Sequence, residues 1–274
     1  VSTPVFVDCE PDFFNIDVEK IEAAITDKTK AIIAVHLYGQ PAQMHAIKKI
    51  ADAHSLLLIE DCAQAHTAAL EDKSIGTFGI AGCFSFYPGK NLGAYGEGGA
   101  IITNDESIYN KLMMIRDHGM PKKYHHDIIG HNYRLEGMQG AVLDVKLKYI
   151  DAWTEKRRKS ADLYRKYLAG IDEIKAPQEM PGGKHVYHLF VIRTSRRDEL
   201  QKFLGEQQVY TGIHYPIPCH LQNAYKSLGY KKGDFPVTDE YADQLLSLPM
   251  SEQLKETEIA FVAEKIKEFF AREN

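Results

Sequence analysis

The sequence predicts an α/β fold, with a large domain built on a mostly parallel sheet and a smaller α+β domain after it. Strand-like and helix-like segments alternate through the first half, and repeated strand–helix–strand units are typical of a parallel sheet with helices on both faces. Several strand-like runs are apolar throughout, which is typical of strands buried on both faces. Near residue 136 the alternation stops, and we place the large domain at residues 1–150 and the small one at residues 151–274.

Hydrophobic periodicity predicts the first elements. Residues 4–7 have the composition of a strand, and four apolar residues then recur at helical spacing: Val18, Ile21, Ala24 and Ile25. The apolar run 31–35 predicts a buried strand. Residues 41–54 have the pattern of an amphipathic helix, with Pro41 suited to its first turn.

Three further strands are predicted in the large domain, at residues 56–59, 83–86 and 100–103. A glycine-rich loop separates the last two. After them, Asn104 or Asp105 can cap a helix that extends through Arg116.

The second half begins with a long charged helical region over residues 153–168. A loop with two prolines and paired glycines follows it. Strands are predicted at residues 186–194 and 209–215, with an amphipathic helix between them. A last amphipathic helix has an apolar face formed by Ile259, Val262, Ile266 and Phe269.

The composition argues against several classes of partner. The 274 residues include 33 basic and 38 acidic side chains, a net charge of −5, whereas nucleic-acid binding needs a basic field. The apolar runs are only strand-sized, so we expect no membrane-spanning segment. The four cysteines show no paired spacing, which favours a reducing cytoplasm over a disulfide framework.

Polar residues follow three of the predicted strands at the point where each strand ends. The strand 31–35 is followed by HLYG, the strand 56–59 by EDCAQAH, and the strand 83–86 by YPGKNLG. Ligands of open parallel sheets bind outside the carboxyl ends of the strands. We therefore expect a polar site where these three segments meet.

Asp61 and Lys90 each admit a structural and a functional interpretation. Asp61 could cap the next helix, or it could pair with a cation such as a protonated pyridine nitrogen. Lys90 could simply be solvated. A Walker loop would need Ser or Thr at Asn91, and the glycines that follow do not fit GxGxxG. A lysine that forms a Schiff base with an aldehyde cofactor remains.

Five blocks of sequence resemble the DegT/DnrJ/EryC1/StrS family. They are TPVFVDCEPDFFNID (3–17), VHLYGQPAQM (35–44), EDCAQAH (60–66), CFSFYPGKNLGAYGEGGAIIT (83–103) and HNYRLEGMQGA (131–141). The family consists of PLP-dependent nucleotide-sugar aminotransferases, so the resemblance implies the PLP-dependent transferase fold type I. Thr67 stands where such proteins usually have glycine. Family members also have an earlier segment of the large domain, so we expect this sequence to begin inside a larger unit, with the large domain incomplete at its start.

The resemblance implies cofactor roles for five residues. Lys90 would form the Schiff base with PLP and move the proton between cofactor and substrate. Asp61 would pair with the pyridinium nitrogen, and Gln64 would lie against the ring. Ser85 would bind the cofactor phosphate. Asn132 would reach the cofactor phosphate of the neighbouring subunit, so that a homodimer shares its active sites.

The segment GIHYPIPCHLQ (212–222) resembles family members that aminate C3 of a nucleotide-linked 3-keto-6-deoxy sugar. Isolated histidines between prolines are otherwise ordinary surface residues. The resemblance implies that His214, Tyr215 and His220 bind the sugar substrate, and Arg134 is a candidate for the diphosphate. We expect the nucleotide to be dTDP, with UDP as the alternative that these residues leave open. The amino donor would be glutamate, and the cofactor would alternate between PLP and PMP.

Two alternatives come from other functional classes. A PLP-dependent sugar dehydratase would have His in place of the Schiff-base lysine, and Lys90 argues against it. A non-catalytic binding or regulatory module could retain the fold, but it would have no need for the cofactor residues together. The histidines between residues 118 and 131 have irregular spacing and lack a completing ligand, so we expect no metal site.

Overall fold

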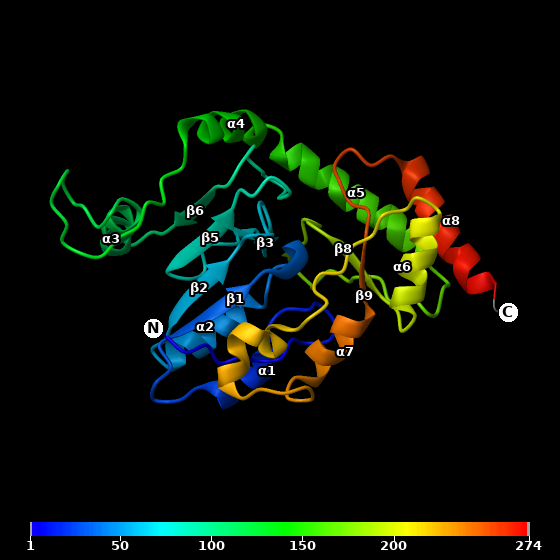
Figure 1. The fold of residues 1–274 in the computed structure, drawn as a ribbon, viewed down its shortest axis with the longest axis horizontal. Coiled ribbons are helices and arrows are strands. Elements are labelled where there is room, and N and C mark those ends of the chain that lie inside the picture. The colour runs from blue at the N-terminus through cyan, green and yellow to red at the C-terminus, as the bar shows by residue number, and fades with distance from the viewer. Residues whose placement is uncertain (1, 273–274) are drawn as a thin grey trace.

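The computed structural model describes residues 2–272. Its central sheet has the strand order β1–β2–β5–β6, formed by Ala31–Val35, Leu57–Asp61, Ala81–Ser85 and Gly99–Ile102 (Figure 1). The first three strands are parallel, and β6 runs antiparallel to β5. The predicted α/β class with a mostly parallel sheet is confirmed.

One face of the sheet packs against the first helices. These are α1 (Val18–Ile21) with its 3-10 extension Glu22–Ala24, and α2 (Met44–Ala53). The helix predicted at residues 41–54 begins at Met44, three residues after the predicted start. The N–H of Ala42 donates to the His36 ring, and the chain turns here before it becomes helical.

The opposite face of the sheet is more open than the sequence predicts. Exposure alternates along β1, where Ile32 is buried and Ile33 is 59% exposed. Leu57, at the start of β2, is 51% exposed. The prediction that the runs 31–35 and 56–59 are buried on both faces is wrong for this chain. Both runs are apolar at every position, so no alternation in the sequence distinguishes the open face.

The predicted strand at residues 4–7 is not formed. Phe6 instead packs against three aromatic rings at centroid distances of 5.2–6.4 Å: Tyr225, Tyr230 and Phe235. Asp8 then accepts hydrogen bonds from the N–H groups of Val237 and Thr238. This segment therefore caps α7 (Pro236–Gln244), more than two hundred residues later in the sequence.

The middle of the chain contains α3 (Glu106–Arg116), α4 (Gly137–Leu147) and α5 (Ile150–Leu168). The predicted start of α3 is confirmed, since Asp105 accepts from the N–H groups of the first turn. A small sheet with the order β4–β3–β7 is not predicted; it consists of Lys73–Ser74, Ala69–Leu70 and Gly183–Lys184. Strands of two residues are too short to show a periodicity.

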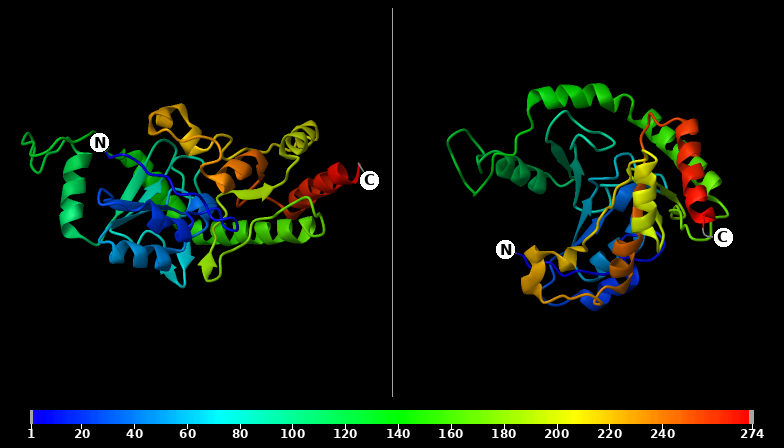
Figure 2. Two further views of the ribbon diagram at one scale, coloured as in Figure 1. Left: turned by 90° about the horizontal axis from the view of Figure 1, so that it is seen from below. Right: turned by 45° about the vertical axis from the view of Figure 1, so that its right-hand side comes forward.

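Four elements of the last third of the chain gather against α5 at one end of the molecule: β8 (Phe190–Arg193), α6 (Arg197–Glu206), β9 (Leu245–Leu248) and α8 (Glu256–Ala271) (Figures 1 and 2). The remaining helix, α7, contacts β8 and the N-terminal segment instead. The prediction of a strand over 209–215 is wrong, since this segment makes a single bridge, between Gly212 and Ser247. The partner of β8 is β9, which follows α7 without a turn residue that could have indicated it.

Two large hydrophobic clusters stabilise the fold. One lies among α5, α6, α8, β8 and β9, and the other among α1, α2, β1 and β2. The division of the chain into domains at residue 150 stays a prediction. Among residues 2–272, no helix combines the length and the apolar character needed to cross a membrane.

Candidate active site

The carboxyl ends of β1, β2 and β5 meet at one edge of the sheet, as expected. Asp61 lies between its two neighbours, in register with Val35 on one side and Cys83 on the other. The N–H of His36 donates to the Asp61 carbonyl at 3.0 Å, which joins the loop after β1 to the end of β2. The three predicted polar segments, which follow β1, β2 and β5, therefore begin side by side at the carboxyl edge of the sheet.

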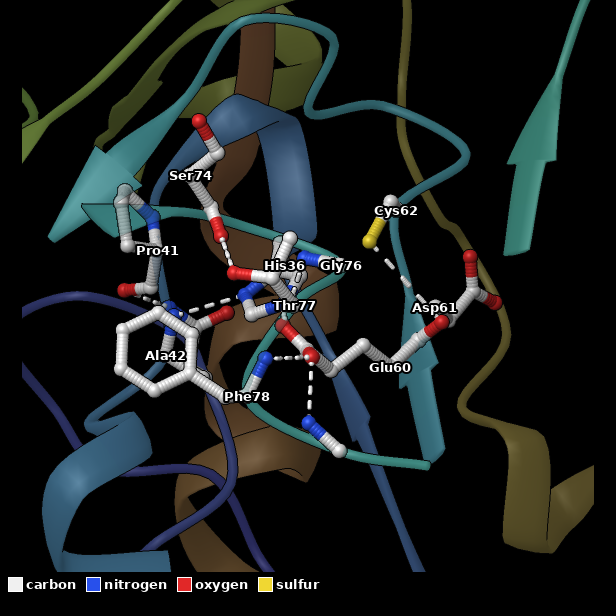
Figure 3. A network of polar contacts seen from close by, with 12 residues as sticks. His36, Pro41, Ala42, Glu60, Asp61, Cys62, Ser74, Gly76, Thr77 and Phe78 are labelled. Atoms are coloured by element: carbon white, nitrogen blue, oxygen red, sulfur yellow. Dashed lines mark hydrogen bonds and ion pairs between the residues drawn. The ribbon is translucent and has the colours of Figure 1, made fainter. Parts of the chain in front are cut away.

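A buried pair, His36 and Glu60, lies directly beneath this edge (Figure 3). The Glu60 carboxylate accepts hydrogen bonds from three backbone N–H groups, those of Gly76, Phe78 and Gly79, all at 2.7 Å. Its fourth partner is His36 Nε2, at 3.2 Å. Burial alone would raise the pKa of Glu60, but these hydrogen bonds hold it below its ordinary value.

The same pair lies close to Cys62, and the three ligand atoms lie within 4.8 Å of one another. The lone pairs of His36 and Glu60 that could bind a metal ion nevertheless accept hydrogen bonds from backbone N–H groups. His36 Nδ1 accepts from the Ala42 N–H at 2.9 Å, so Nε2 has the proton and faces Glu60. We conclude that this cluster is structural and that it fixes the residues on either side of Asp61. The acidic doublet at the end of an apolar strand was the only sequence signal for it.

Asp61 is the last residue of β2, and Lys90 lies in the loop that follows the adjacent strand β5. One Asp61 oxygen accepts from the Ala63 N–H at 3.0 Å in a turn, and no helix begins among the described residues between β2 and β3, so the interpretation of Asp61 as a helix cap is wrong. The other oxygen has no hydrogen bond among residues 2–272. Burial lowers the pKa of Lys90, and the negative charge of Asp61 acts against that shift. The Lys90 amine makes no ion pair within the described chain.

Gln64 is fixed from two sides. Its Oε1 accepts from the Tyr38 N–H at 2.6 Å, and its Nε2 donates to the Tyr215 hydroxyl at 3.4 Å. Tyr38 also donates its hydroxyl to the His214 carbonyl. Tyr38 was not predicted as a site residue, although it joins the strand-end site to the segment 212–222.

Gly39, the next residue, explains why the loop after β1 can approach so closely. Its φ is +96°, and a Cβ at this position would lie 2.7 Å from Val186 Cγ2 and 3.0 Å from the Gln64 carbonyl oxygen. Only glycine fits there. The doublet Tyr38-Gly39 at a strand end was the available signal.

Ser85 ends β5, and its hydroxyl accepts from the Tyr87 N–H at 3.3 Å. The loop that follows turns tightly. A Cβ at Gly93 would lie 2.3 Å from the Pro88 carbonyl oxygen, so this position also requires glycine. The backbone between Ser85 and Gly93 therefore makes a compact turn that contains Lys90.

The predicted substrate residues are divided between two places. His214 Nδ1 lies 2.8 Å from the Ser247 hydroxyl, and His214 and Tyr215 both connect to the strand-end site as described above. His220 is only 3% exposed and lies 3.2 Å from Asp239, with its ring packed against Phe235. The structure thus brings His214 and Tyr215, but not His220, into contact with the strand-end residues.

Asn132 and Arg134 lie on the segment between α3 and α4, which extends to one side of the molecule (Figure 1). Asn132 forms an isolated antiparallel bridge with Asp117, and Arg134 Nη1 contacts the Asp117 carboxylate at 2.6 Å. Neither residue contacts the Lys90 loop of its own chain. Their predicted roles, which include one across a subunit boundary, stay predictions.

Comparison with known proteins identifies the origin of this arrangement. The protein-family model of the DegT/DnrJ/EryC1/StrS aminotransferase family matches residues 1–267. The chain belongs to the DegT/DnrJ/EryC1/StrS family. The resemblance that the sequence blocks indicated is therefore confirmed over nearly the whole chain.

Relatives of this DegT/DnrJ/EryC1/StrS protein support the assignment. It is 51% identical to a "pleiotropic regulatory protein" of Geobacillus stearothermophilus, over 97% of this chain and 72% of that protein. It is 41% identical to the dTDP-3-amino-3,4,6-trideoxy-alpha-D-glucose transaminase of Streptomyces venezuelae, over 99% and 72% of the two chains. The crystal structure of S. venezuelae DesV in complex with a ketimine intermediate superimposes with a TM-score of 0.95, at 41% identity and 97% and 72% coverage.

The cofactor of this enzyme is PLP, which is converted to PMP during transfer. A structural neighbour from Bacillus subtilis, 32% identical with a TM-score of 0.87 over 96% of this chain and 62% of its own, was solved with bound PMP. The donor set at the strand ends fits such a group: a carboxylate with one free oxygen for a pyridinium, a hydroxyl for a phosphate, and an amine for an aldehyde. The chain is a PLP-dependent aminotransferase of fold type I.

Proposed function

We propose that this aminotransferase transfers an amino group from glutamate to C3 of a nucleotide-linked keto-6-deoxy sugar, with dTDP as the nucleotide. The observation that supports it most directly is the meeting of Asp61, Gln64 and Lys90 at the ends of adjacent strands. Relatives of this chain include a dTDP-3-amino sugar transaminase. The segment 212–222 resembles the corresponding segment of C3-specific enzymes.

Asp61, Gln64 and Ser85 would hold the cofactor at the strand ends. The free oxygen of Asp61 would keep the pyridine nitrogen protonated, and PLP then supplies an electron sink for the reacting carbon. Gln64 would present one orientation of its amide to the ring, because Tyr38 and Tyr215 occupy its two polar ends. Ser85 would donate its hydroxyl to the phosphate.

Lys90 would perform the proton transfers. Its burial favours the neutral amine, and a neutral amine can act as a general base. Once displaced by glutamate, Lys90 Nζ would remove the proton from the glutamate α-carbon and deliver it to the cofactor carbon. Water would then cleave the bond between the former α-carbon and the nitrogen, which releases 2-oxoglutarate and leaves the amino group on the cofactor. Lys90 would carry out the same transfers in reverse on C3 of the keto sugar.

The sugar would lie between the strand ends and the segment 212–222. His214 and Tyr215 are the residues of this segment that connect to Gln64 and Tyr38, and we propose that they contact the sugar. A second copy of the chain would supply Asn132 to the cofactor phosphate, which makes the active unit a homodimer. Arg134 would contact the substrate diphosphate, and His220, which lies buried beside Asp239, is the third proposed substrate residue of the segment 212–222.

A non-catalytic role is the alternative that experiment has to separate, since the relative from G. stearothermophilus is named a regulatory protein. The purified holoenzyme is mixed with glutamate and with dTDP- and UDP-linked 3-keto and 4-keto sugars. We expect glutamate to bleach the visible absorbance of the cofactor and the product to have its amino group at C3, as read by mass spectrometry and NMR.

Three outcomes would contradict parts of this proposal. Amination at C4 alone would contradict the C3 assignment, and a preference for UDP sugars would contradict the nucleotide. A protein that stays colourless with added PLP would contradict amino transfer altogether. Lys90→Ala is the matched control and should abolish turnover.

A further inference from the structure

His188 lies between β7 and β8, in a segment whose backbone is fixed against the loop after β1. The Val186 N–H donates to the Gly39 carbonyl at 3.0 Å. Three residues later, the Leu189 N–H donates to the Tyr38 carbonyl at 3.4 Å. His188 is held between these two hydrogen bonds and beside the loop that orients Gln64.

The hydrogen bonds of Asn91 determine which ring nitrogen of His188 has the proton. Asn91 Nδ2 donates to the Val186 carbonyl at 3.0 Å, and because a carbonyl can only accept, this assigns the amide orientation. The amide oxygen therefore faces His188 Nδ1, at 3.2 Å. Since that oxygen can only accept, Nδ1 has the proton and Nε2 has the lone pair.

Nothing in the surroundings of His188 favours a second proton on the ring. Burial, reinforced by the charges of Lys90 and Arg157, lowers the pKa of His188 to about 3. The other titratable groups that act on it are His66 and His214, and burial lowers their pKa values too. No hydrogen bond reaches His188 Nε2 or the Lys90 amine within residues 2–272, so the ring has a free acceptor and the amine a free donor, and the charge of Lys90 acts on the ring.

We propose that His188 is a positioning residue for Lys90, with its Nε2 accepting a hydrogen bond from the Lys90 amine. The two groups belong to one assembly, because Asn91, which binds the other side of the ring, is the chain neighbour of Lys90. The hydrogen bond from Lys90 to His188 would hold the long Lys90 side chain in place after glutamate has displaced it from the cofactor, when it would otherwise be free to rotate. The inference rests on the proposed role of Lys90 as the base.

Two substitutions separate this role from a merely structural one. His188→Gln can place an amide oxygen near the position of Nε2, whereas His188→Asn can imitate only Nδ1 and its bond to Asn91. We expect His188→Asn to lower kcat of the glutamate half-reaction by about 100-fold with little change in KM, as for a misplaced catalytic group. His188→Gln should lose only about fivefold, the equivalent of one ordinary hydrogen bond. The reverse order would overturn the proposal.

A measurement without turnover tests the same claim. Long-range ¹H–¹⁵N NMR spectra of the histidine rings in the wild-type holoenzyme, with His188 assigned by its loss in His188→Gln, should show Nδ1 protonated and Nε2 unprotonated at neutral pH. A proton on Nε2 would overturn the proposal. Full transfer by Lys90→Ala would contradict the proposed function itself. Loss of transfer in Lys90→Ala with full activity in His188→Asn would contradict only the role of His188.

Discussion

Two buried histidine–carboxylate pairs in this chain have the same separation but different surroundings. His36 and Glu60 lie 3.2 Å apart, and backbone N–H groups complete the hydrogen bonding of both side chains. His220 and Asp239 also lie 3.2 Å apart, but His220 Nε2 and Asp239 Oδ1 lack hydrogen-bond geometry. The His220 ring is surrounded by aromatic side chains instead.

The difference corresponds to what each pair supports. His36 and Glu60 immediately precede the loop after β1 and Asp61, so their hydrogen bonds fix the backbone on which the cofactor residues are placed. His220 and Asp239 join the segment after residue 218 to α7, away from the strand ends. The pair with complete hydrogen bonding, His36 and Glu60, is thus the one that supports the cofactor residues, which have to be held rigidly for catalysis.

The largest effect should come from Glu60→Gln. The amide would place a donor against backbone N–H groups that have no other acceptor. Leaving buried groups of a charged network unsatisfied costs about 3–4 kcal/mol of unfolding free energy. Urea unfolding checks this, with Asp239→Asn as the matched control, for which we expect a smaller loss. Equal losses in the two variants would contradict the difference between the pairs.

The pH dependence of the same variant sharpens this comparison. The pKa of Glu60 is lower in the folded chain than its ordinary value of 4.5, so its contribution is complete above that value. The contribution disappears as the pH falls through the folded-state pKa. The penalty of Glu60→Gln should therefore be largest near neutral pH and shrink below about pH 4.5. If the urea midpoints of the wild-type chain and Glu60→Gln stayed equally far apart as the pH falls, the predicted loss of the Glu60 contribution at low pH would be contradicted.

The sequence predicted the parts of this region that depend on local pattern. The three strand ends, the residues Asp61, Gln64, Ser85 and Lys90, and the cap at Asp105 all follow from apolar runs, punctuation or recognisable blocks. The roles of Glu60, Tyr38 and His188 could not be predicted, because their partners are distant in the sequence: the 76–79 loop, the segment 212–222 and Asn91. The same limit explains the wrong strand at residues 4–7, whose aromatic partners lie beyond residue 220.

His220→Phe tests the second pair at a smaller scale. Phenylalanine can occupy the aromatic surroundings, but Asp239 Oδ1 would lose the polar ring nitrogen that lies 3.2 Å away, and we expect the unfolding free energy to fall by about 2 kcal/mol. KM for the nucleotide sugar should not change if the pair is only structural. Unchanged stability together with a raised KM would instead support the predicted role of His220 as a substrate residue.

The smallest effect is expected at Thr67, close to the strand-end site. Its φ is 64°, a left-handed conformation that is unfavourable for a β-branched residue. Its hydroxyl lies 3.0 Å from that of Thr154 on α5, which offsets part of this strain. Thr67→Gly should raise the unfolding free energy by about 0.5 kcal/mol, the strain removed less the hydrogen bond lost. A lower thermal unfolding midpoint in Thr67→Gly than in the wild-type chain would contradict the claim that the Thr67 backbone is strained.

The most direct test of the central claim is the rate at which glutamate bleaches the cofactor absorbance in Asp61→Asn. An amide cannot hold the pyridine nitrogen protonated, so we expect the single-turnover rate to fall by at least about 100-fold, the scale of a lost charge-stabilising contact. Asp105→Asn keeps a helix cap far from the site and should leave the rate unchanged. A wild-type rate in Asp61→Asn would contradict the assignment of the strand-end cluster as the place where the amino group is transferred.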